Sequence, residues 1–435
     1  MKLSSILGLN ARTQLFSYKY NSTSGKKICN SKLLTAKILK KSGIPHPEIF
    51  KVFRRASDIE KFKWENLPNS FALKPSRGMG GEGIIVVKRK TVRQGSSKLG
   101  WLTIQRTKVG VEDLKLHIQD ILEGAYSIGN VPDIAFIQEF VGRHKAFRKY
   151  AFRGTPDIRI IVFNKVPMMA MLRLPTKESY GRANLHQGAI AAGIDIATGI
   201  TTKAIWHNDF VTYKPGTKRK LRGIKIPEWE KVLEIAVRCQ EQTGLGYVGV
   251  DIVLHPEKGP QVLELNAEPG LSIQLANMAG LRKRLDRVDE LTVRDMDHGI
   301  KIAKALFASP FSDRVRQDEV VKIVNTFENI KIKDSQGKKL LVPAKLDTGA
   351  WRTSIDKKLA DELGLLKKSN ILWSKKVRSA LGVEERPVID LIFWLSGKRV
   401  ETNATIADRS ALRRKVVVGR KALKGFLLSP AIKRQ

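Results

Sequence analysis

The stretch that most constrains the fold is residues 249–271, which read GVDIVLHPEKGPQVLELNAEPGL. Two apolar runs flank a His-Pro-Glu-Lys-Gly turn, and this pattern predicts an antiparallel β-hairpin. Glu264 and Asn266 are two residues apart on the second strand, so their side chains project from the same face. Asp251 lies on the partner strand, within cross-strand reach of that pair. The hairpin therefore gathers two carboxylates and an amide among Val and Leu neighbours.

These polar groups suggest a metal site. Carboxylates and amides are costly to bury without a partner. Oxygen ligands in this number suit magnesium, which binds one or two carboxylates and leaves room for water and substrate phosphates. We therefore expect Asp251, Glu264 and Asn266 to bind a metal ion. The alternative is a strand whose polar side chains simply face solvent.

Length and charge limit the class of protein. A chain of 435 residues is too long for one ordinary core, so two or three domains are expected. The formal net charge of +37 predicts attraction to a polyanion such as nucleic acid, an anionic membrane surface or an acidic peptide. Nucleic acid is less favoured, because no binding module or zinc-finger spacing accompanies the basic residues. A generally basic composition would give the same charge without any such partner.

The cysteines and the apolar runs bear on the compartment. Only Cys29 and Cys239 occur, so a disulfide framework is excluded and a reducing compartment is expected. The N-terminal apolar stretch is too short and too polar for a signal peptide, and no run is long enough to cross a bilayer. We expect a cytoplasmic protein without a membrane partner.

A second hairpin is predicted around a glycine-rich run. The strand FALKPS leads into RGMGGEG, and the chain returns as the strand IIVVKRK. Glycines let backbone amides approach a phosphate closely, and Lys74, at the end of the first strand, supplies a positive charge. A strand, not a helix, follows the glycines, which excludes a Rossmann fingerprint. The lysine precedes the glycines, which excludes the Walker pattern.

Other local patterns predict the remaining elements. Helices are expected over 31–42 and 228–243, from an N-cap at Ser57, and in the charged segment 282–307. Residues 90–109 contain Lys, Arg, Gly and Ser and are expected to form an exposed excursion.

Five motifs occur in a recognisable order. They are Lys74 before the glycine hairpin, an IQEF strand, a DIR segment, GRANLHQG, and finally D…E-x-N. Together they resemble the ATP-grasp superfamily, most closely the α-L-glutamate ligase-like branch that adds glutamate to a ribosomal protein. The resemblance covers roughly residues 5–285 and implies two α+β subdomains that enclose ATP.

The resemblance also implies roles for individual residues. ATP phosphates would meet Lys32, Lys74 and the loop glycines Gly78, Gly80, Gly81 and Gly83. Adenine and ribose would meet Glu139 and Phe140, largely through the backbone, and Asp157 and Arg159 would line the acceptor side. Arg173, Arg182 and Asn184 would hold phosphate and an acyl-phosphate intermediate, and Asp251, Glu264 and Asn266 would bind magnesium or manganese. Arg159 and Arg173 could instead be surface-pairing arginines, and Lys32 an exposed helix lysine.

The C-terminal segment carries a separate signal. Asp347-Thr348-Gly349 follows a strand-like stretch, and a carboxylate in such a loop can activate water when two of them share a proton. From about residue 320 to 430, including the segments at Asp408 and Gly419, the chain resembles the retropepsin-like family titled "ATP-dependent zinc protease". A catalytic pair at Asp347 would require a homodimer. Zinc is not expected, since the segment has no His or Cys. A non-catalytic binding domain is the alternative.

The sequence thus predicts an α+β ATP-grasp ligase domain over 1–307, a linker over 308–318 and a small, mostly-β retropepsin-like domain over 319–435. The expected activity is ATP- and magnesium-dependent joining of a carboxylate to an amine through an acyl phosphate. The partner is expected to be an amino acid, such as glutamate, or an acidic peptide. A catalytically silent ATP-binding or polyanion-binding protein is the alternative.

Overall fold

The computed structural model describes residues 5–78, 81–92, 99–308, 322–379 and 382–429. The chain divides into two compact units. The first comprises residues 1–303 and 307–309, and the second comprises residues 304–306 and 310–435. Apart from Ala308, the segment expected to be a linker lies outside the described residues.

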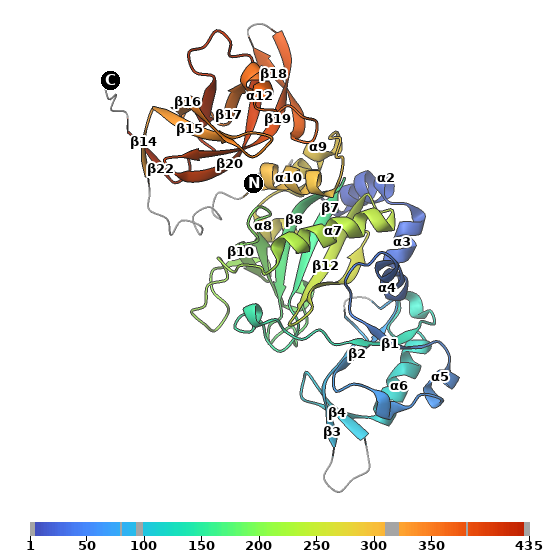
Figure 1. The fold of residues 1–435 in the computed structure, drawn as a ribbon. Coiled ribbons are helices and arrows are strands. Elements are labelled where there is room, and N and C mark those ends of the chain that lie inside the picture. The colour runs from blue at the N-terminus through green and yellow to red at the C-terminus, as the bar shows by residue number, and fades with distance from the viewer. Residues whose placement is uncertain (1–4, 79–80, 93–98, 309–321, 380–381, 430–435) are drawn as a thin grey trace. The chain divides into compact units, whose positions relative to one another are not determined.

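The first unit begins with short helices and a six-stranded sheet (Figure 1). The helices are α1 (Leu9–Ala11), η2 (Arg12–Ser17), α2 (Tyr18–Tyr20), α3 (Thr23–Cys29) and α4 (Lys32–Lys41). The strand order is β1-β6-β2-β3-β4-β5. The strands are β1 (Ile49–Phe53), β2 (Phe71–Pro75), β3 (Ile85–Val92), β4 (Leu99–Thr103), β5 (Lys108–Gly110) and β6 (Ala135–Glu139). The expected hairpin around the glycine run is confirmed, since β2 and β3 pair in antiparallel register.

Two helices, α5 (Ala56–Glu60) and α6 (Val111–Leu122), pack with this sheet around an aromatic and aliphatic core. One local prediction is wrong here and another is wrong in part. The N-cap of α5 is Arg55, not Ser57, and Asp58 accepts the backbone N–H groups of Arg54 and Arg55. Of the segment 90–109, expected to be an exposed excursion, residues 105–108 are exposed and 93–98 lie outside the described residues, but β4 buries Trp101 fully in the core.

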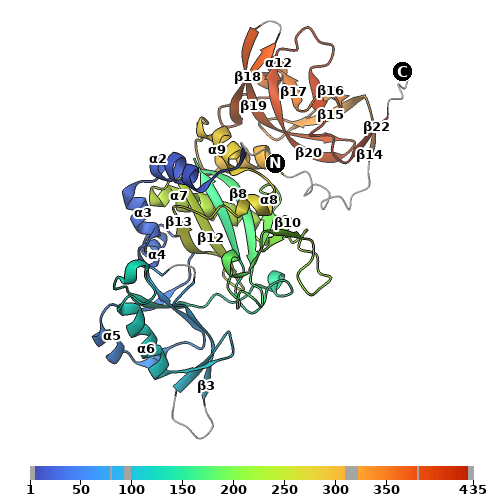
Figure 2. The same cartoon turned by 180° about the vertical axis from the view of Figure 1, so that it is seen from behind.

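A seven-stranded antiparallel sheet follows, in the order β11-β10-β9-β8-β7-β12-β13. The strands are β7 (Asp157–Phe163), β8 (Val166–Leu174), β9 (Ile190–Ile194), β10 (Thr201–Trp206), β11 (Asp209–Val211), β12 (Tyr247–His255) and β13 (Gly259–Asn266). The helices are α7 (Trp229–Thr243), which crosses the sheet in Figure 1, α8 (Ile273–Asn277), α9 (Leu281–Asp289) and α10 (Met296–Phe307). The reverse view in Figure 2 shows α8 beside β8.

Helix α7 matches its prediction, and its capping residue Gly244 has the left-handed φ of 67° that favours glycine. The segment 282–307 is largely helical, as predicted, and is divided between α9 and α10. None of the helices in the described part of the chain is long and apolar enough to cross a membrane.

The described part of the second unit is a β-barrel with one short helix, α12 (Lys357–Glu362). Strand order is β15-β16-β21-β17-β20-β19-β18, and β15 also pairs with β19, which closes a ring of strands around an apolar core. The strands are β15 (Phe327–Lys333), β16 (Lys339–Asp347), β17 (Thr353–Asp356), β18 (Ile371–Ser379), β19 (Gly382–Leu395), β20 (Lys398–Ala407) and β21 (Val416–Gly419). A separate parallel pair joins β14 (Lys322–Asn325) to β22 (Phe426–Ser429). This is the small β domain that the sequence predicts.

Candidate active site

The predicted hairpin of residues 249–266 is confirmed as β12 and β13. Asp251 lies directly opposite Glu264, and Gly249 lies opposite Asn266. The other edge of β12 pairs with β7, which places Arg159 opposite Asp251. Strand β7 in turn pairs with β8, which places Arg173 opposite Asp157. Four neighbouring strands therefore carry opposite charges side by side.

These charges form one hydrogen-bonded network. Arg159 donates from Nε to Asp251 Oδ1 at 2.7 Å and from Nη2 to Oδ2 at 2.6 Å. Arg173 donates from Nη2 to Asp251 Oδ2 at 2.7 Å and to Asp157 Oδ2 at 2.8 Å, and from Nε to Asp157 Oδ1 at 2.5 Å. Both arginine side chains are only 12% exposed. The alternative that they pair at the protein surface is therefore wrong.

Burial and charge act in opposite directions on the two aspartates. Burial raises the pKa of Asp157 to about 6, although the Arg173 guanidinium opposes the rise. Burial also acts to raise the pKa of Asp251, but Arg159 and Arg173 outweigh it and hold the pKa at about 2. Both carboxylates are therefore ionised at neutral pH, and each negative charge is matched by a guanidinium.

Glu264 and Asn266 are the members of the expected metal site that no described arginine pairs. The half-buried Glu264 carboxylate makes no hydrogen bond or ion pair with any described residue. The Asn266 amide nitrogen donates to Asp251 Oδ2 at 3.4 Å. One free carboxylate beside an amide oxygen suits a hard cation that also binds phosphate. Asp251 differs, because both of its oxygens already accept hydrogen bonds from arginine.

Two lysines also belong to this part of the structure, with Lys74 near both Glu264 and Lys32. Lys74 Nζ donates to Gln138 Oε1 at 2.8 Å. Burial, and after it the nearby Lys32, lower the pKa of Lys74 to about 8, and Glu264 opposes the fall. Lys32 Nζ donates to the Gly78 carbonyl at 2.6 Å, so it is not the freely exposed helix lysine of the alternative reading.

The glycine run is closely packed where it is described. A Cβ on Gly78 would lie 2.3 Å from Pro75 Cγ, and Gly83 has a left-handed φ of 67°. The carbonyl of Gly83 is hydrogen-bonded to His117 Nε2 at 2.8 Å. A Cβ on Gly81 would lie 3.8 Å from the Arg182 side chain. Gly80 lies outside the described residues.

Arg182 and Asn184 lie in the connection between β8 and β9. The Arg182 guanidinium is exposed and has no hydrogen bond or ion pair to a described residue. Asn184 Oδ1 accepts the His186 N–H at 3.0 Å and caps the short helix η6 (Leu185–Gln187). Neither side chain joins the arginine–aspartate network.

Glu139 ends β6, and Phe140 follows it, half-buried. The Glu139 carboxylate accepts the Glu48 N–H at 3.2 Å and pairs with Lys258 Nζ and, at 3.5 Å, His255 Nε2. His255 is the last residue of β12, and Lys258 lies in the turn that leads to β13. The Glu139 side chain is therefore occupied within the protein.

Sequence reasoning missed four of these contacts. They are made by Gln138 on Lys74, by His117 on the glycine run, and by His255 and Lys258 on Glu139. All four join segments far apart in the chain, so no local pattern indicated them.

Asp347 belongs to the second unit, at the end of β16. Its Oδ1 accepts the backbone N–H groups of Gly349 at 2.9 Å and Ala350 at 3.2 Å, and Lys345 lies 3.4 Å from Oδ2. The N–H of Gly349, and then that of Ala350, lower the pKa of Asp347 below its ordinary value. This is a carboxylate held ionised in a tight loop.

Comparison with known proteins gives a family. The family described as sugar-transfer associated ATP-grasp matches residues 11–290. No curated protein matches the chain. Among solved structures, the ATP-grasp ligase PsnB, complexed with a phosphomimetic variant of minimal precursor, Mg and ADP, is 16% identical with a TM-score of 0.33, over 62% of this chain and 61% of that one.

Two further structures are similar at this level. D-alanine–D-alanine ligase from Bacillus anthracis, complexed with ATP, is 15% identical with a TM-score of 0.36, over 62% of this chain and 68% of that one. Lpg0085 from Legionella pneumophila, of unknown function, is 21% identical with a TM-score of 0.19, over 26% of this chain and 94% of that one. The chain thus spans about three fifths of PsnB.

Proposed function

Because the chain belongs to the sugar-transfer associated ATP-grasp family, we propose that it uses ATP and magnesium to join a carboxylate to an amine. ATP would supply the phosphoryl group that activates the carboxylate as an acyl phosphate. The magnesium ion would neutralise charge on the transferred phosphate. Glutamate, another amino acid or an acidic peptide is the proposed substrate, and the basic charge of the chain suits the last of these.

The residues present fit these ligands in the following way. Lys32 and Lys74, with the glycine run, would hold ATP phosphates, and the backbone at Glu139 and Phe140 would hold adenine. Glu264 and Asn266 would bind the metal ion, and Asp251 would join them only by releasing a guanidinium. Arg159 and Arg173, once released, would offer donors to an acyl phosphate, with Asp157 positioning Arg173. Arg182 is proposed to reach phosphate and Asn184 to support its loop.

One observation carries the proposal. Glu264 is a half-buried carboxylate without a hydrogen bond or ion pair in the described part of the chain, and it acts electrostatically on Lys74 and Arg173. Burying a charged carboxylate costs free energy unless a cation pairs with it. An unpaired carboxylate at this position does not stabilise the strand, so a structural role does not explain Glu264.

The test is substrate-stimulated formation of ADP and phosphate across amino acids and short acidic peptides. We expect stimulation in the wild type, its loss in Glu264→Ala, and its retention in Glu290→Ala, which removes an exposed glutamate at the end of α9. The alternative is a catalytically silent ATP-binding or polyanion-binding protein, and the complete pairing of Asp251 by arginines favours it. ATP binding without stimulation by any pair of substrates would support that alternative.

For the second unit, we propose a retropepsin-like fold in which Asp347 activates water in a homodimer. The support is the closed barrel and the ionised carboxylate in the loop after β16. A single carboxylate cannot share a proton, so a second copy must supply the other. Cleavage of peptides by wild type but not by Asp347→Asn is expected. No cleavage by the wild type would leave a binding domain as the better account, and intact cleavage in the variant would exclude Asp347 as the catalytic group.

A further inference from the structure

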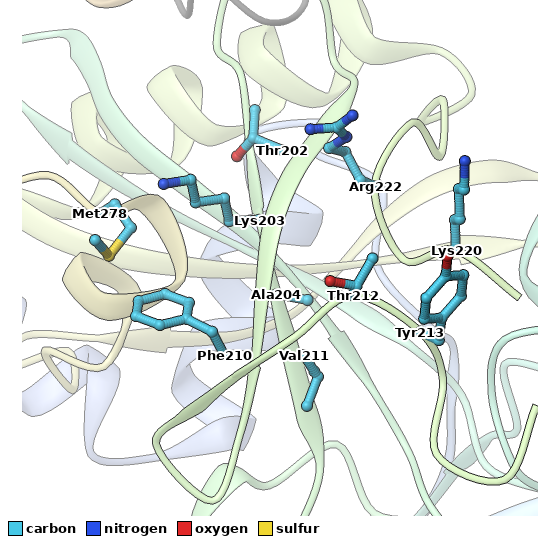
Figure 3. A pocket seen from close by; sticks show the side chains of 10 residues that line it. All are labelled: Thr202, Lys203, Ala204, Phe210, Val211, Thr212, Tyr213, Lys220, Arg222 and Met278. Atoms are coloured by element: carbon cyan, nitrogen blue, oxygen red, sulfur yellow. The ribbon is translucent and has the colours of Figure 1, made fainter. Parts of the chain in front are cut away.

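A hollow of about 450 Å³ lies at the outer edge of the seven-stranded sheet (Figure 3). It is lined by β10, β11, the segment that follows them and the end of α8. Three strands, β9, β8 and β7, stand between β10 and the strand of Asp251. None of the residues proposed for ATP or metal binding lines it, so the hollow is a separate feature of the same unit.

One end of the hollow is apolar. Phe210 and Met278 lie near each other in Figure 3, and their exposed fractions are 57% and 38%. Covering large apolar side chains at a concave surface removes them from water, which favours binding of a ligand there. A phenyl face is also a stacking platform for a flat ring.

Three basic residues also line the hollow. Lys203, Lys220 and Arg222 line it, and no carboxylate does. Neither Lys203 nor Lys220 pairs through its ammonium group with any described residue. Residues 201–225 contain seven basic residues and one acidic residue, whereas the whole chain has 79 and 42. The positive charge is therefore concentrated here beyond the general basic composition.

The apolar wall is held in place before any ligand arrives. A Cβ on Gly193 of β9 would come within 2.4 Å of the Ala276 carbonyl oxygen, so α8 packs directly on the sheet. Asn277 Nδ2 also donates to the Ala170 carbonyl at 2.9 Å. Met278 itself has a left-handed φ of 48°, which is uncommon for a residue with a side chain. A preformed wall reduces the ordering cost of binding.

We propose that this hollow binds a small organic anion that combines a flat ring with a phosphate or diphosphate group, the chemistry of a nucleoside diphosphate. The ring lies against Phe210 and Met278, and the phosphates lie toward Lys203, Lys220 and Arg222. The volume suits a ligand of this size. The inference does not depend on the ligase activity, because none of these residues belongs to the candidate active site.

The test uses uridine diphosphate as the probe and the full chain, with a saturating non-hydrolysable ATP analogue to fill the ATP site. Calorimetric titration is expected to show one further nucleotide bound per chain. Phe210→Ala removes the stacking face and Lys203→Gln removes a charge, and each is expected to weaken binding about tenfold. Analogue binding and the melting temperature should stay unchanged in both variants.

Matched controls distinguish binding in the hollow from a general electrostatic attraction of the anion to the basic chain. Lys218→Gln removes one charge from the same basic segment without touching the hollow, and Phe50→Ala removes an exposed phenyl group from β1. Both are expected to bind uridine diphosphate as the wild type does. No binding by the wild type, or equal loss in Lys218→Gln and Lys203→Gln, overturns the proposal. Tighter binding of an acidic hexapeptide or of poly(U), weakened by the same two variants, also overturns it.

Discussion

Lys74 offers the sharpest test of the ATP site, because its charge depends on pH in the range where binding can be measured. Its pKa is about 8 and not the ordinary 10.5, since the ammonium is buried beside Lys32. That difference corresponds to about 3 kcal/mol between its charged and neutral forms. At pH 9 only about a tenth of the free protein carries a charged Lys74. A ligand phosphate must then restore the proton when it binds.

Two results follow for a non-hydrolysable ATP analogue. Affinity should fall about tenfold from neutral pH to pH 9, and binding at pH 9 should take up nearly one proton per site. Calorimetry in buffers of different ionisation enthalpy measures that uptake. In Lys74→Gln both effects should disappear, while Lys61→Gln, an exposed lysine next to α5, should behave as the wild type.

The free energy of unfolding should change with pH in the opposite direction to the affinity for the analogue. The folded state favours the neutral amine, so the protein without ligand gains stability as the pH rises from 8 toward 10.5. Lys74→Met should therefore raise the melting temperature at pH 7 while it weakens analogue binding. An affinity that is the same at pH 7.5 and pH 9.5, or equal proton uptake in wild type and Lys74→Gln, would refute the reasoning.

Two packing predictions concern the seven-stranded sheet. Arg173→Met leaves Asp157 unpaired and should lower the free energy of unfolding by about 3–5 kcal/mol, measured by denaturant titration; adding Asp157→Asn should recover part of the loss. If the single variant is as stable as the wild type, the network does not hold these charges. Gly193→Ala pushes a Cβ against Ala276 and should cost about 1–3 kcal/mol, whereas Gly8→Ala, with open space around it, should cost nothing measurable. Equal melting temperatures of these two glycine variants would contradict the packing.

Local sequence patterns predicted most helices and strands, but they did not predict which strands pair with one another. The β2–β3 and β12–β13 hairpins, α7 and the ATP-grasp fold follow from turn residues, apolar periodicity and motif order. Asp251 was expected among metal ligands because alternation fixes which face a side chain occupies. Alternation does not say which strand comes next, and the pairing of β12 with β7 brought Arg159 opposite Asp251.

The same limit explains the segment 90–109. Its Lys, Gly and Ser content suggested exposure, yet β4 pairs with β3 and buries Trp101 against Phe71. A tryptophan inside a polar segment was the one available signal, since such a side chain gains most from a core.

The pairing of β14 with β22 has a consequence for how the second unit can be handled. These are its first and last described strands, and they run in parallel over four residue pairs from Lys322–Phe426 to Asn325–Ser429. The first residue of β14 and the last residue of β22 are therefore only about 10 Å apart, the length of such a strand. A fold whose ends meet tolerates being joined there and opened elsewhere. The barrel should accept circular permutation through a short link between its ends, and it can be inserted whole into a surface loop of a host protein.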